Sequence, residues 1–389
     1  MSENAMRKNG RDISPSMTRR GVLGGGLAAS AVVVSSPHTV NAAAPGTDQV
    51  SVRQEGSYDT VALAKDSVEY ACVQHPVLPV DPANPRPGIA ANLKRMVTLI
   101  DEHAHWAGPA DLLSFHEFPI AGYAGWTRKE MLSVAIEIPG KETDVLAAKA
   151  REYGLWLTFG CYAQDPDWLD HVLMLGVLMN PKGEIVAKHW KARGGHGLNP
   201  AFELITTTVY DVLPRYVEMY GWDEVIPVAR TEVGNICITG VQNDPLLYAS
   251  MALKGCELCI RQASGSNPTD DAVMTSRYNG YFTSIVSNSI SPGNRYFADA
   301  AGGFGVTQII GPNGTPLAKA WGPHEEIVRA KIPLAAHRER RTLPDWKMDI
   351  YRPVFDAYRA RVGPGEYLDG LPETMKEAAT RYYPDGRWN

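Results

Sequence analysis

The chain has 389 residues, of which 44% are hydrophobic and 21% are charged, and its formal net charge is −5 at pH 7. This composition is typical of a globular protein with a large core. A mildly acidic chain without basic blocks argues against nucleic acid or an anionic membrane surface as a partner. The partner that we expect is therefore a small molecule.

The first 44 residues differ in character from the rest. Arg19 and Arg20 precede a weakly apolar run of Gly, Ala and Val that ends near Ser36, and Ala42 fits a small-residue cleavage site. A twin-arginine pair before such a run is typical of a Tat export signal. The run is too short and too rich in glycine to span a membrane. We expect residues 1–44 to be a signal peptide and linker, the Tat machinery to be a transient partner, and the protein to be periplasmic or secreted.

Strands and helices alternate in the sequence after an N-terminal extension at residues 45–67. Apolar and β-branched runs predict strands at 70–74, 111–115, 155–163, 172–179, 184–188, 235–241 and 258–262. Apolar residues at helical spacing predict helices at 89–103, 143–153, 245–254 and 271–287. Tight turns at 180–183 and 311–314 predict two hairpins.

This alternation predicts one α/β domain over residues 68–337, with two layered sheets. The glycine-rich stretch at 194–200 predicts a loop at the mouth of a pocket. Residues 338–389 are rich in Arg, Tyr, Pro and Trp, and we expect this C-terminal extension to contact a neighbouring surface or subunit.

Five cysteines are present, and an odd number in an exported chain leaves at least one free thiol. Most of them lie in runs that predict buried strands, which favours inert core residues. Cys256 and Cys259 have the spacing of a metal or redox pair, but no second pair accompanies them. No phosphate-binding loop, dinucleotide fingerprint or metal-ligand cluster occurs, so we expect neither a cofactor nor a metal.

Several separated segments, in order, resemble the nitrilase (carbon–nitrogen hydrolase) superfamily. The segments that carry the resemblance are Val73-Gln74, Phe115-His116-Glu117-Phe118 with Gly122-Tyr123, Lys188-His189-Trp190-Lys191, Glu218-Met219-Tyr220, Thr231 to Pro245, Lys254-Gly255-Cys256-Glu257-Leu258 and Ile309 to Gly314. The resemblance implies an α/β fold of the four-layer αββα sandwich type. It also implies a homodimer or a larger homo-oligomer.

The superfamily's site consists of two glutamates, a lysine and a cysteine. A carboxylate takes the thiol proton and returns it to the leaving amine, a lysine stabilises the oxyanion, and the cysteine forms a thioester. The resemblance implies that Glu117 is the base, Lys191 the oxyanion lysine and Glu218 the second carboxylate.

The nucleophile position holds no cysteine in this chain. Counting from Thr231 places the family's cysteine at Val241, whereas counting back from Pro245 and Gly255 places it at Thr239. Residues 237, 239 and 241 are expected to share one face of a strand. Cys237 would then lie about 13 Å down the strand from Val241, and the hydroxyl of Thr239 is a weak nucleophile. Neither replaces the thiol cleanly.

Other polar and aromatic groups accompany these motifs. Gln242 and Asn243 follow the nucleophile position and are candidates for binding a ligand or orienting water. His116 replaces the family's proline, and it is a candidate either for the site or for the core. Tyr123 and Trp190 are candidate substrate-binding residues, although aromatic residues at such spacing also build cores.

Three functions remain open from the sequence. The first is a hydrolase of a small, non-peptide C–N or related bond that works without the usual cysteine. The second is a non-covalent acid/base enzyme, such as a lyase, hydratase or isomerase. The third is a catalytically inactive binding protein. Retention of the Glu, Lys and Glu set favours activity, because buried charges are costly unless they are used.

Overall fold

The computed structural model describes residues 49–53, 56–194, 204–264, 269–289 and 307–382. These residues belong to one compact unit, residues 45–389. The expected export signal at 1–44 and most of the glycine-rich loop at 194–200 lie outside the described residues.

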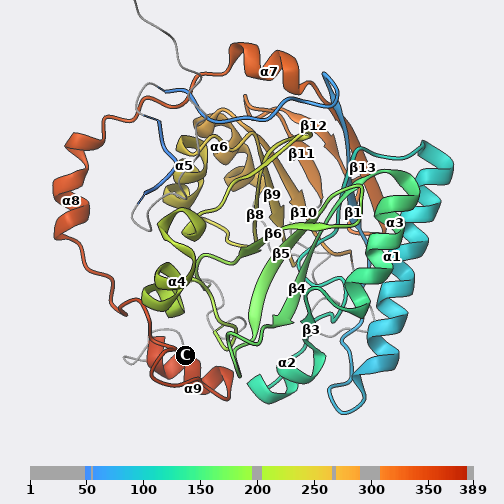
Figure 1. The fold of residues 1–389 in the computed structure, drawn as a ribbon, viewed down its shortest axis with the longest axis vertical. Coiled ribbons are helices and arrows are strands. Elements are labelled where there is room, and N and C mark those ends of the chain that lie inside the picture. The colour runs from blue at the N-terminus through green and yellow to red at the C-terminus, as the bar shows by residue number, and fades with distance from the viewer. Residues whose placement is uncertain (1–48, 54–55, 195–203, 265–268, 290–306, 383–389) are drawn as a thin grey trace, which may run out of the picture. The chain divides into compact units, whose positions relative to one another are not determined.

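Two β-sheets form the centre of this unit (Figure 1). The first sheet has the strand order β13-β1-β2-β4-β5-β6, with β3 beside β4. Its strands β1, β2 and β4 are parallel, and the β5–β6 hairpin continues it in antiparallel fashion. The strands of this sheet are β1 (Val68–Gln74), β2 (Leu112–Ser114), β3 (Ile136–Glu137), β4 (Trp156–Gln164), β5 (Leu173–Met179), β6 (Ile185–Trp190) and β13 (Glu326–Ile332).

The second sheet has the order β12-β11-β10-β9-β8-β7. Strands β8, β9 and β10 are parallel, so their carboxyl ends lie at one edge of the sheet. The strands of this sheet are β7 (Ala229–Thr231), β8 (Gly234–Thr239), β9 (Leu258–Gln262), β10 (Phe282–Val286), β11 (Gln308–Ile310) and β12 (Pro316–Lys319).

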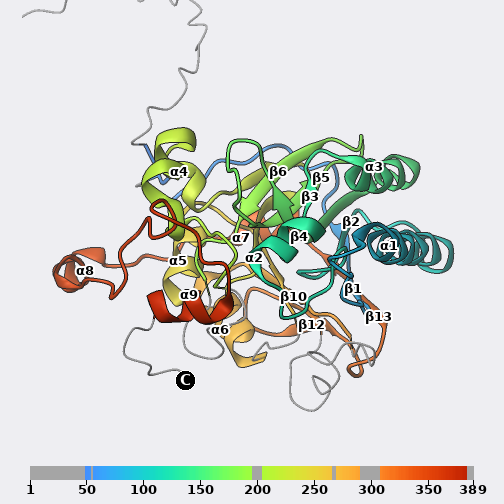
Figure 2. The ribbon, with the colours of Figure 1, turned by 90° about the horizontal axis from the view of Figure 1, so that it is seen from below.

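Helices cover the outer face of each sheet, as Figure 2 shows from below. An apolar cluster joins α1 (Pro85–Ala107), α2 (Arg128–Val134) and α3 (Lys141–Tyr153) to the first sheet. Smaller clusters join α5 (Pro245–Leu253) and α6 (Thr269–Asn279) to the second sheet. A further apolar cluster, which includes Ile236 and Leu112, lies between the two sheets. These clusters define four layers, so the expected αββα sandwich is confirmed.

One expected element is wrong. The helix expected at 271–287 is a helix that ends at Asn279 and a strand, β10, that begins at Phe282. Gly280 separates them with a φ of 64°, a left-handed conformation that glycine adopts without strain. The run from Phe282 to Val286 is rich in aromatic and β-branched residues, which favour a strand.

Two glycines allow the close approach that brings strand ends together. A Cβ on Gly160 of β4 would lie 2.3 Å from the backbone oxygen of Glu117. A Cβ on Gly176 of β5 would lie 2.3 Å from Cγ2 of Ile238, across the gap between the sheets. Larger residues at either position would push these segments apart.

The described chain after β13 runs around the domain and includes the α-helices α7 (Leu334–Arg340), α8 (Arg352–Ala357) and α9 (Met375–Tyr382) (Figure 1). The segment around α9 is tied to α4 (Leu213–Tyr220) and the turn before it through Asp211. The Tyr382 hydroxyl donates to the Asp211 carboxylate, and the Tyr367 amide donates to the Asp211 carbonyl oxygen. Burial raises the pKa of Asp211 to about 7. Within the described part of the chain, no helix is both long and apolar enough to cross a membrane.

Candidate active site

A buried ion pair marks the candidate site. Lys191 Nζ donates to Glu117 Oε1 at 3.0 Å, and each side chain is only 3% exposed. Glu117 follows β2, and Lys191 follows β6, which runs in the same direction as β2 and β4. The two residues therefore meet at one edge of the first sheet. The structure thus places Glu117 and Lys191 together, and their expected roles as base and oxyanion lysine stay predictions.

Position 240 of the second sheet faces this pair. A Cβ built on Gly240 would lie 2.5 Å from Glu117 Oε1 and 3.4 Å from Lys191 Nζ. Gly240 follows the last residue of β8 directly. A side chain at position 240 would therefore point from the second sheet at Glu117 and Lys191. Because this residue is glycine, only a hydrogen atom lies there.

The three expected nucleophile positions, 237, 239 and 241, lie on the other face of the strand from residue 240, because side chains alternate between faces. Ile236 and Ile238 pack in the cluster between the sheets, on the same side as Gly240. Cys237 and Val241 instead belong to the cluster under α5, together with Leu247, Tyr248 and Met251. The Cys237 thiol donates to the Pro227 carbonyl at 3.4 Å, and the Thr239 hydroxyl accepts from the Val241 amide at 3.0 Å. The structure therefore does not bring the Cys237 and Val241 side chains to the ion pair.

A histidine next to Lys191 holds the end of β8. His189 lies on β6, and its Nδ1 accepts from the Ile238 amide of β8 at 3.0 Å, which links the two sheets. Burial lowers the pKa of His189 to about 4. An Nδ1 that accepts must be unprotonated, so the hydrogen bond and the lowered pKa both require a neutral ring. The sequence prediction assigned no role to His189, although it lies inside the Lys188–Lys191 motif.

The turn after Gly240 is braced from the opposite side by buried charges. Arg261 of β9 is fully buried, and one of its Nη atoms donates both to the Gln242 side chain and to Asp271. Asp271 also accepts from the Asn243 amide at 3.1 Å. Asn243 has a φ of 53°, a left-handed conformation that the turn requires. Gln242 and Asn243 thus shape the turn through these contacts.

Arg193 adds a second brace. Its Nε donates to Asp244 Oδ2 at 2.5 Å, and one Nη donates to the Gln242 carbonyl. Asp244 also caps α5, because its side chain accepts from the Leu247 amide. The sequence analysis did not single out Arg193, Arg261 or Asp271. Arg261 gives the one available signal, because it is a charged residue in a buried strand that begins with three apolar residues.

The expected second carboxylate is not in the site. Glu218 lies on α4 and is exposed to solvent. The buried residue of α4 is Tyr216. Residues two apart on a helix point about 200° away from each other, so burial of Tyr216 turns Glu218 outward. The expected role of Glu218 as the second carboxylate is therefore corrected.

His116 directly precedes Glu117 in the sequence, and its side chain is buried. Its Nδ1 accepts from the Phe118 amide at 3.2 Å, and its ring lies 4.5 Å from that of His75. Burial, followed by the neighbouring His75, lowers the pKa of His116 well below the usual value. The Nε2 atom of His116 is buried without a hydrogen-bond partner in the part of the chain that the structure describes. His116 is thus a neutral ring with an unused polar atom.

The candidate aromatic residues pack in the core. Tyr123 stacks on Phe118, and its hydroxyl contacts the sulfur of Met375 on α9 at 4.0 Å. Trp190 packs edge-on against Trp168 and Tyr216. Both belong to the cluster that joins the first sheet to its helices. Among the described residues, no group of three or more His, Cys, Asp or Glu side chains is arranged to hold a metal ion.

The His189–Ile238 hydrogen bond predicts a pH dependence. Because the pKa of His189 is lowered to about 4 in the folded protein, its contribution to stability is present above the ordinary value near 6.5. That contribution is lost as the pH falls from there towards 4. A His189→Asn variant offers an oxygen acceptor that does not titrate. Between about pH 7.5 and 4.5, the free energy of unfolding should fall in both proteins. We expect the fall to be about 2 to 3 kcal/mol smaller in His189→Asn than in the wild type.

Denaturant unfolding at the two pH values measures this difference. His105→Asn, at an exposed histidine on α1, is the control and should follow the wild type. Equal loss of stability in His189→Asn and the wild type would show that His189 does not hold the sheets as a neutral acceptor.

Comparisons with known proteins place this geometry in a family. A family model described as carbon-nitrogen hydrolase matches residues 71–342. A formamidase from Helicobacter acinonychis is 26% identical over 338 residues, which cover 84% of this chain and 92% of the relative. A formamidase from Bacillus thuringiensis is 25% identical over 277 residues, which cover 67% of this chain and 73% of the relative.

Solved structures show the same fold. A carbon-nitrogen hydrolase from Helicobacter pylori aligns with a TM-score of 0.58 at 16% identity, covering 74% of this chain and 98% of that one. A mutant amidase from Nesterenkonia sp., in complex with acrylamide, aligns with a TM-score of 0.54 at 16% identity, covering 76% and 99%. The family model spans most of the domain, including both residues of the buried ion pair and the turn that faces it, and the chain therefore belongs to the carbon–nitrogen hydrolase family.

Proposed function

We propose that this protein is an amidase-like hydrolase of small, non-peptide amides that works without a cysteine nucleophile. The observation that carries the proposal is the buried Glu117–Lys191 pair, with its 3.0 Å contact, facing Gly240. Formamidase relatives and an amidase complex with acrylamide support short amides as the substrate class to test.

Burial of this pair favours a chemical role over a structural one. Removing two charges from water costs more than their attraction usually returns, so an apolar pair of similar volume is often as stable. Glu117 and Lys191 are each nearly inaccessible, at 3% exposure. A charged pair kept at such a position, at the end of two strands, is typical of a site that handles protons and developing charge.

The pair is able to support direct attack by water. Glu117 would take a proton from water as the oxygen forms a bond with the amide carbonyl carbon. Lys191 would stabilise the negative charge that develops on the carbonyl oxygen. When the C–N bond breaks, the proton passes from Glu117 to the leaving nitrogen. The products are a carboxylic acid and ammonia or an amine, so the reaction balances without an acyl-enzyme.

The cysteines of the chain support a route without a thiol. Each of the five is buried in an apolar cluster, and none is in a disulfide. Burial raises the pKa of Cys72 to about 12 and raises those of Cys161, Cys256 and Cys259 as well. A thiol that resists ionisation is a poor nucleophile.

Two matched carboxyl-to-amide variants test this function. Glu117→Gln is expected to lower the release of ammonia from formamide, acetamide or propionamide at least 100-fold, because general-base catalysis typically contributes that much. Glu218→Gln should leave the rate unchanged, since Glu218 is exposed on α4. The measurement is the steady-state rate of ammonia release.

A Glu117→Gln variant with full turnover would contradict the assignment of the base. A folded wild type that releases no ammonia from any short amide would contradict amide hydrolysis. That result would favour the non-covalent acid/base enzyme or the inactive binding protein.

We also propose that the chain is exported through the Tat pathway. Support comes from Arg19 and Arg20 before the apolar run and from the small residues near Ala42. A fusion of residues 1–44 to a reporter that fluoresces after export in the folded state should reach the periplasm. Replacing both arginines with lysine should retain the reporter in the cytoplasm. Export of the double-lysine fusion at the wild-type level would contradict this proposal.

We propose further that the C-terminal extension contacts a second copy of the chain. Residues 346–358, which we call the strap, include α8 and expose a set of apolar side chains. Helix α8 stands apart from the other helices in Figures 1 and 2. Such a set is uncommon on a surface that stays in water. The most exposed members are Ile350 at 67%, Val354 at 67% and Tyr358 at 69%.

Sedimentation of two variants tests this contact. A double variant with Ile350→Asp and Val354→Asp is expected to sediment as a smaller species than the wild type, because charges would be buried in the contact. Leu169→Asp, at a comparably exposed apolar residue outside the strap, should sediment like the wild type. A monomeric wild type, or an unchanged assembly in the double variant, would contradict a contact through the strap.

A further inference from the structure

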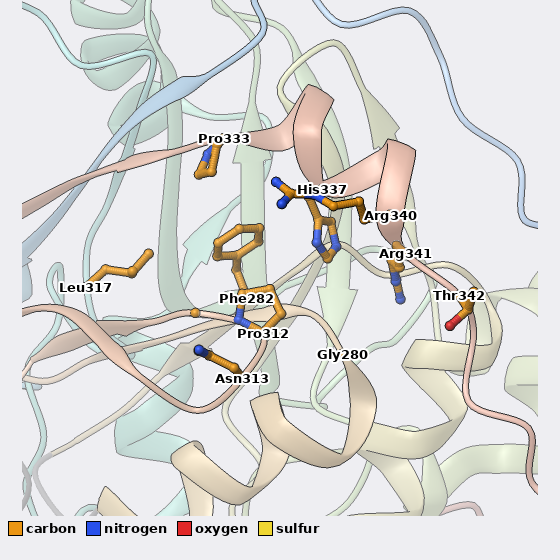
Figure 3. Close-up of a pocket in the computed structure, with 11 residues that line it drawn as sticks. Gly280, Phe282, Pro312, Asn313, Leu317, Pro333, His337, Arg340, Arg341 and Thr342 are labelled. Atoms are coloured by element: carbon orange, nitrogen blue, oxygen red, sulfur yellow. The ribbon is translucent and has the colours of Figure 1, made fainter.

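A cavity of about 540 Å³ lies at the end of the second sheet opposite the candidate active site. Its walls come from three places: the start of β10 at Phe282, the turn between β11 and β12, and the last part of α7. Figure 3 shows these elements around the cavity. The volume lies within the range of small-ligand sites.

The α7 wall carries excess positive charge. Arg340 and Arg341 both line the cavity, and neither makes an ion pair within the part of the chain that the structure describes. The nearest buried carboxylate, Glu257, is already held by Arg338, by the Tyr58 hydroxyl and by a backbone amide. Glu339, on the same helix, is exposed.

Several nitrogen atoms in this wall have no partner. His337 Nε2 and the Nε and one Nη of Arg341 are buried without a hydrogen bond to any described residue. Burial lowers the pKa of His337 to about 4, so its ring is neutral near pH 7. The other Nη of Arg341 donates to the Gly255 carbonyl at 3.4 Å, and its guanidinium lies over the Tyr58 ring, 4.7 Å from the centroid. The charge of Arg341 therefore lies behind the cavity wall, where it attracts an anion without direct contact.

The opposite wall is mostly apolar, and Asn313 is its polar residue. Phe282 packs edge-on to the His337 ring, with centroids 5.0 Å apart. Pro312 and Leu317 extend this surface along the turn between β11 and β12, as Figure 3 shows. Leu317 is 44% exposed, so its side chain is available to a ligand.

We propose that this cavity binds a small organic carboxylate that has an apolar body. The carboxylate would contact Arg340, whose two Nη atoms present paired donors that match its geometry, while its Nε donates to the Ala336 carbonyl. The charge of Arg341 behind the wall would add to the attraction. The apolar body would lie on Phe282, Pro312 and Leu317. The two walls meet in one cavity, and this combination selects an organic anion over an inorganic one.

This cavity is separate from the Glu117–Lys191 pair. Phe282 is the first residue of β10, whereas Gly240 follows the last residue of the parallel strand β8. The two places therefore lie at opposite ends of the same parallel strands. Binding here does not depend on the proposed hydrolase activity.

Calorimetric titration of the full chain with benzoate tests the site at neutral pH. Arg340→Gln is expected to weaken benzoate binding about tenfold, which is the loss typical of one charge-assisted hydrogen bond. Arg340 is exposed, so this variant should remain folded. Arg341→Gln, with a circular dichroism spectrum that matches the wild type, should weaken binding less than Arg340→Gln does, because its charge acts without direct contact.

Three further variants test where benzoate binds. Arg352→Gln removes an exposed charge on α8 and should bind benzoate like the wild type. Glu117→Gln should also bind like the wild type, because the candidate active site is elsewhere. Leu317→Ser should weaken the binding of benzoate but not that of inorganic phosphate.

Distinct outcomes would overturn the proposal. These are no benzoate binding by the wild type at millimolar concentration, unchanged binding in Arg340→Gln, or loss of binding in Glu117→Gln. Phosphate that binds as tightly as benzoate would show that the apolar wall has no role, and it would overturn the choice of an organic carboxylate.

Discussion

The buried contact between Glu117 and Lys191 is the interaction on which the rest of the site depends. Two charges that are almost excluded from water are stable only when each is held at the right distance from the other. The protein achieves this by ending β2 and β6 at the same edge of one sheet. Gly160 lets β4 pass against the backbone of Glu117 at a distance that no larger residue allows. The packing of the first sheet therefore sets the geometry of the pair.

The second sheet supplies what faces the pair. His189 links the end of β6 to β8 through a neutral nitrogen, at Ile238, two residues before Gly240. Beyond that point, Arg261 and Asp271 hold the turn that begins at Gly240. A glycine at this position leaves the Glu117 carboxylate free to occupy the space that a side chain would take. This arrangement is compatible with the proposed attack by water, which needs no side chain at position 240.

The sequence predicts those features of the site that depend on a short, continuous motif, and it misses those that depend on contacts between distant segments. Glu117 and Lys191 were identified because each lies in a short motif at a strand end, and strand ends at one edge meet. The turn was harder, because motifs before and after it indicated residues 241 and 239. The side-chain direction alternates at every residue of a strand, so a displacement of one residue selects the opposite face. Only the structure shows that residue 240 faces the pair.

The remaining errors have similar causes. Glu218 was expected from the resemblance of its short segment to the family, whereas a helix turns about 100° per residue, so the exact position decides which side chain points inward. The segment from residue 271 to 287 has apolar residues that fit a helix or a strand, and only the left-handed Gly280 separates the two elements. The role of His189 depends on a contact with the other sheet, at Ile238, which no local pattern reveals.

A pair of cysteine variants tests most directly whether position 240 faces the proposed catalytic pair, Glu117 and Lys191. Purified Gly240→Cys and Val241→Cys proteins would be incubated with a short amide and examined by mass spectrometry for an acyl group on the new thiol. The account predicts an acyl adduct on the cysteine of Gly240→Cys, because its side chain would point at Glu117 and Lys191. It predicts none on Val241→Cys, whose side chain packs under α5 with Leu247 and Tyr248. An adduct on Val241→Cys, with Gly240→Cys folded and unmodified, would contradict the account.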